Sequence, residues 1–305
     1  MNMKKFSLMA ALLGLLAVAG CGGNGSTKDE LKPSFIWESN PNFAQMEIGK
    51  NMDAVVTAEV PGGVAILTVK ANIPTKLVGM AEQMIGISAN KQGDELVFDL
   101  IQDKTANTAL TREGFTSVSS GAQSFRMDFS KLLDAIIGKA EVPNGAVFQF
   151  TVNVEDRSGN KASRQTKFHW TAAPAFTLTG PNPYTLTKGT KEPLIVEVTA
   201  PGKIESFTIT FGGASAAEEI LTDIKNRTSG ETNVVDLIHD TDAAKALKLP
   251  TNLANQTTAR LDFSSWVQEM WSYSVNKAST TEVVFEVEDV LGKVSKLEVL
   301  LVKSN

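Results

Sequence analysis

The chain repeats itself, and this internal duplication limits its possible folds more than any other feature of the sequence. The spacing between matched segments falls gradually, from 141 residues for the first pair to 133 for the last, as a few loop deletions would produce. The sequence therefore predicts two copies of one domain, at residues 33–170 and 174–303. Five segments recur in the same order: Pro33–Phe35 as Pro174–Phe176, Val60–Gly62 as Ala200–Gly202, Asp99–Ile101 as Asp236–Ile238, Arg126–Ser130 as Arg260–Ser264, and Val154–Asp156 as Val287–Asp289.

Within each copy, hydrophobic residues recur mainly with a period of two. Residues 148–154 alternate apolar and polar side chains, and residues 283–287 do the same in the second copy. This alternation is typical of a strand with one face in a core and the other in water. The turn at Asp156–Asn160 contains a capping Asp and a Gly able to adopt positive φ, so it should close a hairpin. Several short strands in about 135 residues per copy predict a β-sandwich.

Two segments of the first copy resemble parts of a known fold family. Val152–Asp156, followed by Gly159 and Asn160, resembles the last hairpin of bacterial immunoglobulin-like domains, and Phe125–Phe129 resembles the strand before it. The resemblance covers about half of each copy and implies a fold class rather than an activity. We expect an all-β protein with short helical insertions, built as two tandem immunoglobulin-like β-sandwich domains that arose by internal duplication.

Short helices are expected inside each copy. Residues 217–226 carry apolar side chains at helical spacing. After Ser130, which we expect to be an N-cap, residues 132–137 form an apolar stripe. The repeat aligns Trp266 and Trp271 with positions of this stripe, so both tryptophans are expected to pack in a core rather than to stack on sugar rings.

The N-terminus has the layout of a secretory signal. Two lysines precede thirteen largely apolar residues at 6–18, a run too short to span a bilayer, which needs about 20. The segment Leu16–Cys21 resembles a bacterial lipobox, which implies that Cys21, the sole cysteine, is lipidated and begins the mature chain. We expect a lipoprotein signal peptide at 1–20 and, at 21–32, the lipidated cysteine and a flexible tether. An ordinary secretory signal with a chance cysteine is the alternative.

The tether suggests a location. Lys28-Asp29-Glu30 resembles the Lys-acidic-acidic patch by which Bacteroidota lipoproteins are exported to the cell surface. The resemblance implies a lipid-anchored outer-membrane protein exposed at the surface, with a periplasm-facing location as second choice. The membrane, reached through acyl chains such as palmitate on Cys21, is the first expected partner, and an unknown surface glycan or protein is the second.

Composition excludes several classes of site. The net charge of −5 offers nothing to neutralise phosphates, so no nucleic-acid partner is expected. One cysteine and two histidines exclude a disulfide framework and a Cys/His zinc site, and no cofactor is expected. His169 and His239 are expected at surface or boundary positions rather than in a nucleophile triad. Asp156 and Asp289 are each expected to cap their own turn, which is a plainer reading than calcium binding.

These features favour a non-catalytic, lipid-anchored surface protein that acts as a binding or spacer module, for a glycan or a matrix component. Tyr184 and Tyr273 are the candidate ligand-contact residues. The alternative is a fimbrial-type structural subunit, which would polymerise by adding a strand to a partner's sheet. A complete last hairpin in each copy, with no exposed edge expected, argues against that alternative. An enzyme is not expected.

Overall fold

The computed structural model describes residues 32–38, 46–49, 52–85, 90–92, 95–138, 141–189, 192–216, 218–228, 232–273 and 279–303. All of them belong to the compact unit Lys32–Asn305. The expected signal peptide, Cys21 and the tether up to residue 31 lie outside the described residues.

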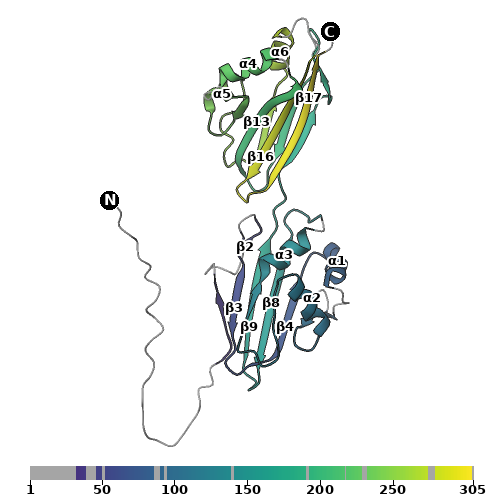
Figure 1. Cartoon of the computed structure of the whole chain (residues 1–305), viewed down its shortest axis with the longest axis vertical. Helices are drawn as coiled ribbons and strands as arrows, with labels where there is room; N and C mark the ends of the chain where they lie inside the picture. Colours follow the sequence, from purple (N-terminus) through teal and green to yellow (C-terminus); the bar gives the residue numbers. More distant parts are fainter. Residues whose placement is uncertain are drawn as a thin grey trace, which may run out of the picture. The chain divides into compact units, whose positions relative to one another are not determined.

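The first copy contains two sheets, drawn in purple to teal in Figure 1. A three-stranded sheet has the order β1-β3-β7, and a six-stranded sheet has the order β2-β9-β8-β4-β6-β5. Neighbouring strands are antiparallel except β2 and β9, which are parallel. The strands are β1 Ser34–Trp37, β2 Met46–Glu47, β3 Val55–Glu59, β4 Val64–Asn72, β5 Asn90–Gln92, β6 Glu95–Asp99, β7 Ser124–Asp128, β8 Val147–Asp156 and β9 Lys161–His169.

The second copy repeats this plan. Its sheets have the orders β10-β12-β15 and β11-β17-β16-β13-β14, and again the one parallel pair, β11 with β17, joins a two-residue strand to the last strand. In the described residues the two copies share no sheet, and each has its own hydrophobic core. The strands are β10 Ala175–Thr179, β11 Tyr184–Thr185, β12 Ile195–Thr199, β13 Ile204–Ser215, β14 Val234–Asp236, β15 Thr258–Asp262, β16 Ser279–Asp289 and β17 Val294–Lys303.

This topology confirms the predicted fold class, a mostly β immunoglobulin-like sandwich with short helices. The first strand of each copy pairs in the small sheet, and the chain then crosses to the large sheet beside the last strand. The alternation at residues 148–154 has the expected cause, since Phe148, Phe150, Val152 and Val154 are buried and the residues between them are half-exposed.

Aromatic rings occupy the centre of each core. In the first copy Phe129 lies 5.2–6.4 Å, centroid to centroid, from the rings of Trp37, Phe115, Phe150 and Phe168. Its counterpart Phe263 packs on Trp266 and Phe285. The motif that recurs at Arg126–Ser130 and Arg260–Ser264 therefore delivers an equivalent ring to each core.

Six helices are described in the two copies: α1 Thr75–Ile85, α2 Lys104–Arg112, α3 Phe129–Ile137, α4 Glu218–Arg227, α5 Thr241–Ala246 and α6 Trp266–Tyr273. Figure 1 shows the first three beside the sheets of the first copy, where their buried side chains join its core. The helix expected at 217–226 is α4, whereas α1, α2 and α5 were not expected. No helix in the described ranges is both long and apolar enough to span a membrane.

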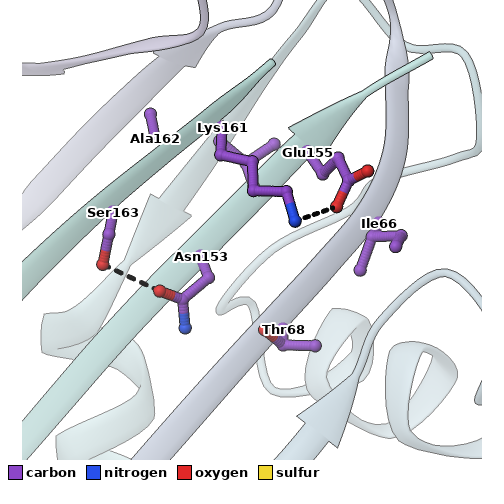
Figure 2. Close-up of a pocket in the computed structure, with 8 residues that line it drawn as sticks. Ile66, Thr68, Asn153, Glu155, Lys161, Ala162 and Ser163 are labelled. Carbon is purple, nitrogen blue, oxygen red and sulfur yellow. Dashed lines mark hydrogen bonds and ion pairs between the residues drawn. The ribbon is translucent and has the colours of Figure 1, made fainter. Parts of the chain in front are cut away.

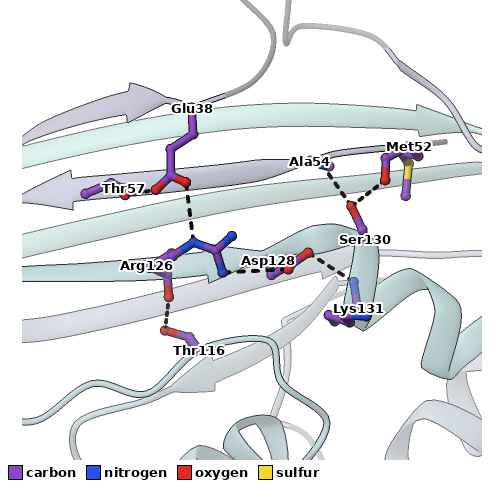
Figure 3. Close-up of polar contacts among 9 residues, drawn as sticks. All are labelled: Glu38, Met52, Ala54, Thr57, Thr116, Arg126, Asp128, Ser130 and Lys131. Carbon is purple, nitrogen blue, oxygen red and sulfur yellow. Dashed lines mark hydrogen bonds and ion pairs between the residues drawn. The ribbon is translucent and has the colours of Figure 1, made fainter. Parts of the chain in front are cut away.

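The expectation that Ser130 caps a helix is wrong. Asp128, the last residue of β7, is the N-cap of α3, and its side chain accepts a hydrogen bond from the Lys131 amide (Figure 3). Ser130 instead ties the helix to the start of β3: its Oγ accepts from the Ala54 amide at 2.8 Å and donates to the Met52 carbonyl at 3.1 Å. Ser264 accepts from the Leu194 amide in the same way.

The last hairpin of each copy lies against an earlier turn, the one that joins β3 to β4 in the first copy and β12 to β13 in the second. Asp156 Oδ1 accepts from the amides of Ser158 and Asn160, at 2.9 and 2.8 Å, which confirms that this Asp caps its turn. A Cβ added at Gly62 would lie 2.6 Å from Asp156 Oδ2, so any other residue there would displace the Asp156 carboxylate. Asp289 and Gly202 repeat both features in the second copy.

Candidate functional site on the first sandwich

A shallow hollow lies on the solvent-facing side of the large sheet in the first copy (Figure 2). Its volume is about 470 Å³. The register of β4, β8 and β9 builds it from two cross-strand rows: Ile66 with Glu155 and Lys161, and Thr68 with Asn153 and Ser163. The hairpin turn at 157–159 fixes the register of β8 with β9, and the pairing of β4 with β8 brings Ile66 and Thr68 to the same face.

The side chains around the hollow are partly paired with one another. Lys161 Nζ lies 3.1 Å from Glu155 Oε2, and Ser163 Oγ donates to Asn153 Oδ1 at 2.8 Å (Figure 2). Asn153 Nδ2 makes no hydrogen bond to the described residues and stays available as a donor. Ile66 is 36% exposed and adds an apolar contact. The hollow can thus exchange hydrogen bonds with a polar ligand while touching its apolar surface.

The equivalent face of the second copy has a different chemistry. The repeat matches Gln149, Asn153 and Gln165 with Glu282, Glu286 and Glu298. Neutral amides of the first face are therefore carboxylates on the second, where Lys296 forms an ion pair with Glu286. The hydrogen-bonding character of the hollow belongs to the first copy rather than to the fold.

The hollow borders a sheet edge that the sequence did not lead us to expect. The last hairpin is complete in both copies, as predicted, but β2 pairs with β9 only at Phe168 and His169. Residues 161–167 of β9 have no strand partner on their outer side within the described ranges. Within the described residues the expectation that no edge is exposed is therefore not met, because β2 covers only Phe168 and His169.

The structure corrects one candidate contact residue. Tyr184 is 0% exposed, and its hydroxyl donates to the Glu192 carbonyl at 2.7 Å. A side chain enclosed in the core cannot touch a ligand, so Tyr184 is a packing residue. Tyr273 ends α6, and its side chain lies outside the described part of the structure.

The two tryptophans of α6 differ. Trp266 is 4% exposed and packs edge-on against Phe211, which confirms its expected place in the core. Trp271 is half-buried, and the ammonium groups of Lys188 and Lys303 lie 5.7 and 5.2 Å from its ring centroid. The Trp271 ring therefore makes cation–π contacts with two lysines, and these contacts compete with the stacking of a sugar on the ring.

The histidines lie where the sequence predicted. His169 is half-buried at the end of β9, and the side chain of His239 is 75% exposed. Nδ1 of His239 lies 2.9 Å from Asp236 Oδ2. Burial raises the pKa of Asp236, but hydrogen bonds from His239 and Ile238 outweigh it and hold the pKa below its usual value.

An Arg–Asp pair on the small sheet recurs in both copies, each time beside a glutamate. In the first, Arg126 reaches Glu38 at 3.4 Å and Asp128 at 3.7 Å, and Thr57 donates to Glu38 (Figure 3). The hydrogen bond from Thr57, opposed by burial and aided by Arg126, lowers the pKa of Glu38. In the second copy Arg260 likewise lies between Glu197 and Asp262. The glutamate directly follows β1 in the first copy and lies in β12 in the second. Because both copies hold the arginine between two carboxylates, the arrangement links strands of the fold rather than marking a site.

Sequence reasoning did not single out the residues of the hollow. The solvent-facing positions of the alternating strand, Asn153 and Glu155, were visible, and folding the hairpin about its turn would have paired them with Ser163 and Lys161. Among the described residues, no group of three or more His, Cys, Asp or Glu side chains could hold a metal ion.

No protein-family model matches the chain, and no curated protein matches it. Solved structures do match. BcpA, the major pilin subunit of Bacillus cereus, is 5% identical with a TM-score of 0.26, over 90% of this chain and 69% of that one. Drosophila N-cadherin EC1-4 is 13% identical with a TM-score of 0.32, over 90% of this chain and half (50%) of that one. DIP-gamma IG1+IG2 is 10% identical with a TM-score of 0.33, over 90% and 99%. Similarity this low says nothing about what the present chain binds.

Proposed function

We propose that this chain is a non-catalytic, lipid-anchored protein of the outer membrane, displayed at the cell surface, whose first sandwich binds a ligand. The lipobox at Cys21 and the tether patch Lys28-Asp29-Glu30 support the anchor and the location. The observation that carries the binding role is the hollow on β4, β8 and β9, which combines an amide donor, a carboxylate, an ammonium group and an exposed isoleucine.

The ligand that suits this hollow is rich in hydroxyl groups, such as an oligosaccharide of a glycan or matrix polymer. Asn153 Nδ2 can donate a hydrogen bond to a sugar hydroxyl, and Ser163 Oγ, whose own proton goes to Asn153, can accept one. Ile66 supplies contact for the apolar side of a sugar ring. No aromatic side chain lines the hollow, so we expect recognition by hydrogen bonds rather than by ring stacking.

The binding role is tested on glycan and matrix arrays with the soluble mature chain. Asn153→Ala should weaken binding about tenfold, because a hydrogen-bonding group that faces the ligand is lost. Glu286→Ala, at the matched position of the second copy, should leave binding unchanged. Silent arrays, or equal binding by both variants, would contradict the proposal.

The anchor is tested separately. Cys21→Ala should release the protein from the membrane fraction and abolish its labelling by a palmitate analogue, because the acylated thiol is gone. Protease treatment of intact cells should digest the wild-type protein if it faces outward. A membrane-bound, labelled Cys21→Ala variant would refute the lipid anchor, and protection from protease would favour the periplasmic face.

A fimbrial-type structural subunit is the second candidate function, and the partly unpaired edge of β9 favours it. Size-exclusion chromatography of the purified mature chain after protease treatment provides the test. A ladder of oligomers would support polymerisation, whereas a stable monomer would contradict it.

A further inference from the structure

The backbone of β9 is arranged to accept another strand. The Trp170 amide donates to the Ala146 carbonyl, and the Asp156 amide donates to the Asn160 carbonyl. Since hydrogen-bonding direction alternates along an antiparallel strand, even-numbered residues of β9 bond to β8 and odd-numbered residues point away from it. The bond from the Ile48 amide to the His169 carbonyl agrees with this alternation.

The second copy closes the corresponding positions with a side chain. Asn182 Nδ2 donates to the Glu298 carbonyl at 2.8 Å, and Asn182 Oδ1 accepts from the Leu300 amide at 3.0 Å. The side-chain amide of Asn182 thus makes the two hydrogen bonds that an additional strand would make at this point on the outer edge of β17. The matching groups in the first copy, the Gln165 carbonyl and the Lys167 amide, bond to none of the described residues.

Charge distinguishes the same two edges. Lys161, Arg164 and Lys167 lie on the described edge of β9, and the repeat matches them with Val294, Leu297 and Leu300 on β17. Glu155 is the carboxylate paired with one of these cations, Lys161. All three cationic positions of the first edge are therefore apolar in the second.

We propose that the edge of β9 at residues 161–167 accepts an extended acidic segment of a partner protein as an additional strand. Main-chain hydrogen bonds to the odd-numbered residues would give affinity. Lys161 and Lys167 on the outer face, and Arg164 on the opposite face over the Trp37 ring, would select acidic side chains. The cations disfavour pairing of two β9 edges, since six positive charges would meet. The tether of another molecule of this protein would also be a poor ligand, because its lysines at 28 and 32 balance Asp29 and Glu30 and leave no net negative charge. This docking edge goes beyond the proposed ligand hollow.

Amide hydrogen exchange tests the geometry directly. The probes are two synthetic peptides, one alternating Glu and Val and the other alternating Lys and Val, added to the soluble mature chain. In the free chain the amides of Ser163, Gln165 and Lys167 should exchange rapidly, while those of Arg164 and Thr166 are protected. The Glu-Val peptide should protect the odd-numbered amides, and the Lys-Val peptide should not.

A proline variant separates strand addition from simple charge attraction. Gln165→Pro removes an outward N–H without removing a bond to β8, and Gln165 does not line the hollow. It should weaken Glu-Val binding about tenfold, the effect of one main-chain hydrogen bond and the added steric block. Glu298→Pro, at the matched position of β17, should have no effect. The double variant Arg164→Glu/Lys167→Glu should reverse the preference toward the Lys-Val peptide.

Two results would overturn the proposal. Protection of the odd-numbered amides in the free chain would show that the edge is already paired. Unchanged Glu-Val binding by a folded Gln165→Pro variant would show that no strand is added. Neither result bears on the glycan and matrix arrays, so the docking edge and the ligand hollow can fail independently.

Discussion

The first and second sandwiches contain the same interior and different exteriors. Both keep a core phenylalanine directly after the Arg-x-Asp motif, Phe129 or Phe263. Both also keep a serine that accepts a hydrogen bond from a distant backbone amide, and a glycine that leaves room for the Asp of the last hairpin. They differ on the outer face of the large sheet and on the edge of its last strand. After a duplication, the features common to both copies are those that folding requires. The features that differ are free to serve binding, and in the first copy these are the amide-bearing outer face and the cationic edge.

The comparison predicts that each copy is stabilised by its own core. Phe129→Ala should have the largest effect, about 3–5 kcal/mol, because the ring contacts four other aromatic side chains. Urea unfolding should show an earlier transition for the first copy and an unchanged one for the second. Phe263→Ala is the matched control and should shift only the second transition. If both transitions move together with either variant, the copies do not unfold independently.

A smaller effect is expected at the serine that both copies keep. Ser130→Ala should cost about 1–3 kcal/mol, because the buried Ala54 amide loses its acceptor and the Met52 carbonyl loses a donor. Ser264→Ala should cost about 1–2 kcal/mol, since its hydroxyl accepts a longer bond, 3.2 Å, from the Leu194 amide and also hydrogen-bonds to the Asp262 carboxylate near the surface. Thermal unfolding of the two variants provides the measurement. A larger loss for Ser264→Ala would show that the two ties have diverged.

The smallest effect at neutral pH concerns Asp156. Burial raises the pKa of this carboxyl, but hydrogen bonds from Asn160, Ser158 and Gly159 outweigh it and hold the pKa below the usual value. A lowered folded-state pKa contributes stability above the unfolded pKa of about 4, and this is lost as the pH falls through the folded value. The first copy should therefore lose stability below about pH 4.

Asp156→Asn keeps an oxygen acceptor for the turn and removes the charge. The unfolding midpoint of the first copy, followed from about pH 7 to pH 3, should vary less in this variant than in the wild type. If the unfolding midpoint of the variant falls with pH as steeply as that of the wild type, the loss of stability in acid arises from other carboxyls whose pKa is lowered, such as Glu38.

The sequence predicted what depends on local periodicity. Alternating burial at residues 148–154 identified a strand because each residue's face follows from its neighbours. The cap of α3 was misassigned because Asp128 and Ser130 can both accept a backbone hydrogen bond, and the end of β7 decides between them.

Features that depend on distant pairing could not be predicted in this way. Tyr184 is buried because a two-residue strand sets it beside Leu301, more than a hundred positions away. In the described part of the chain, the unpaired stretch of the β9 edge likewise depends on where β2 begins and ends, for which the sequence has no periodic signal. The hollow lies between these cases, since the pairing of β8 with β9 follows from a local hairpin but that of β4 with β8 joins distant segments.

The fit between Gly62 and Asp156 has a consequence for how each sandwich forms. The turn belongs to the early part of the copy, and the carboxylate and the inner strand β8 belong to its last third. A chain that ends before β8 lacks both one of the two strands that pair with β4 and the carboxylate that lies against Gly62. Contacts between such distant segments slow folding. Each sandwich should therefore assemble late, closing as a whole once its final hairpin is available.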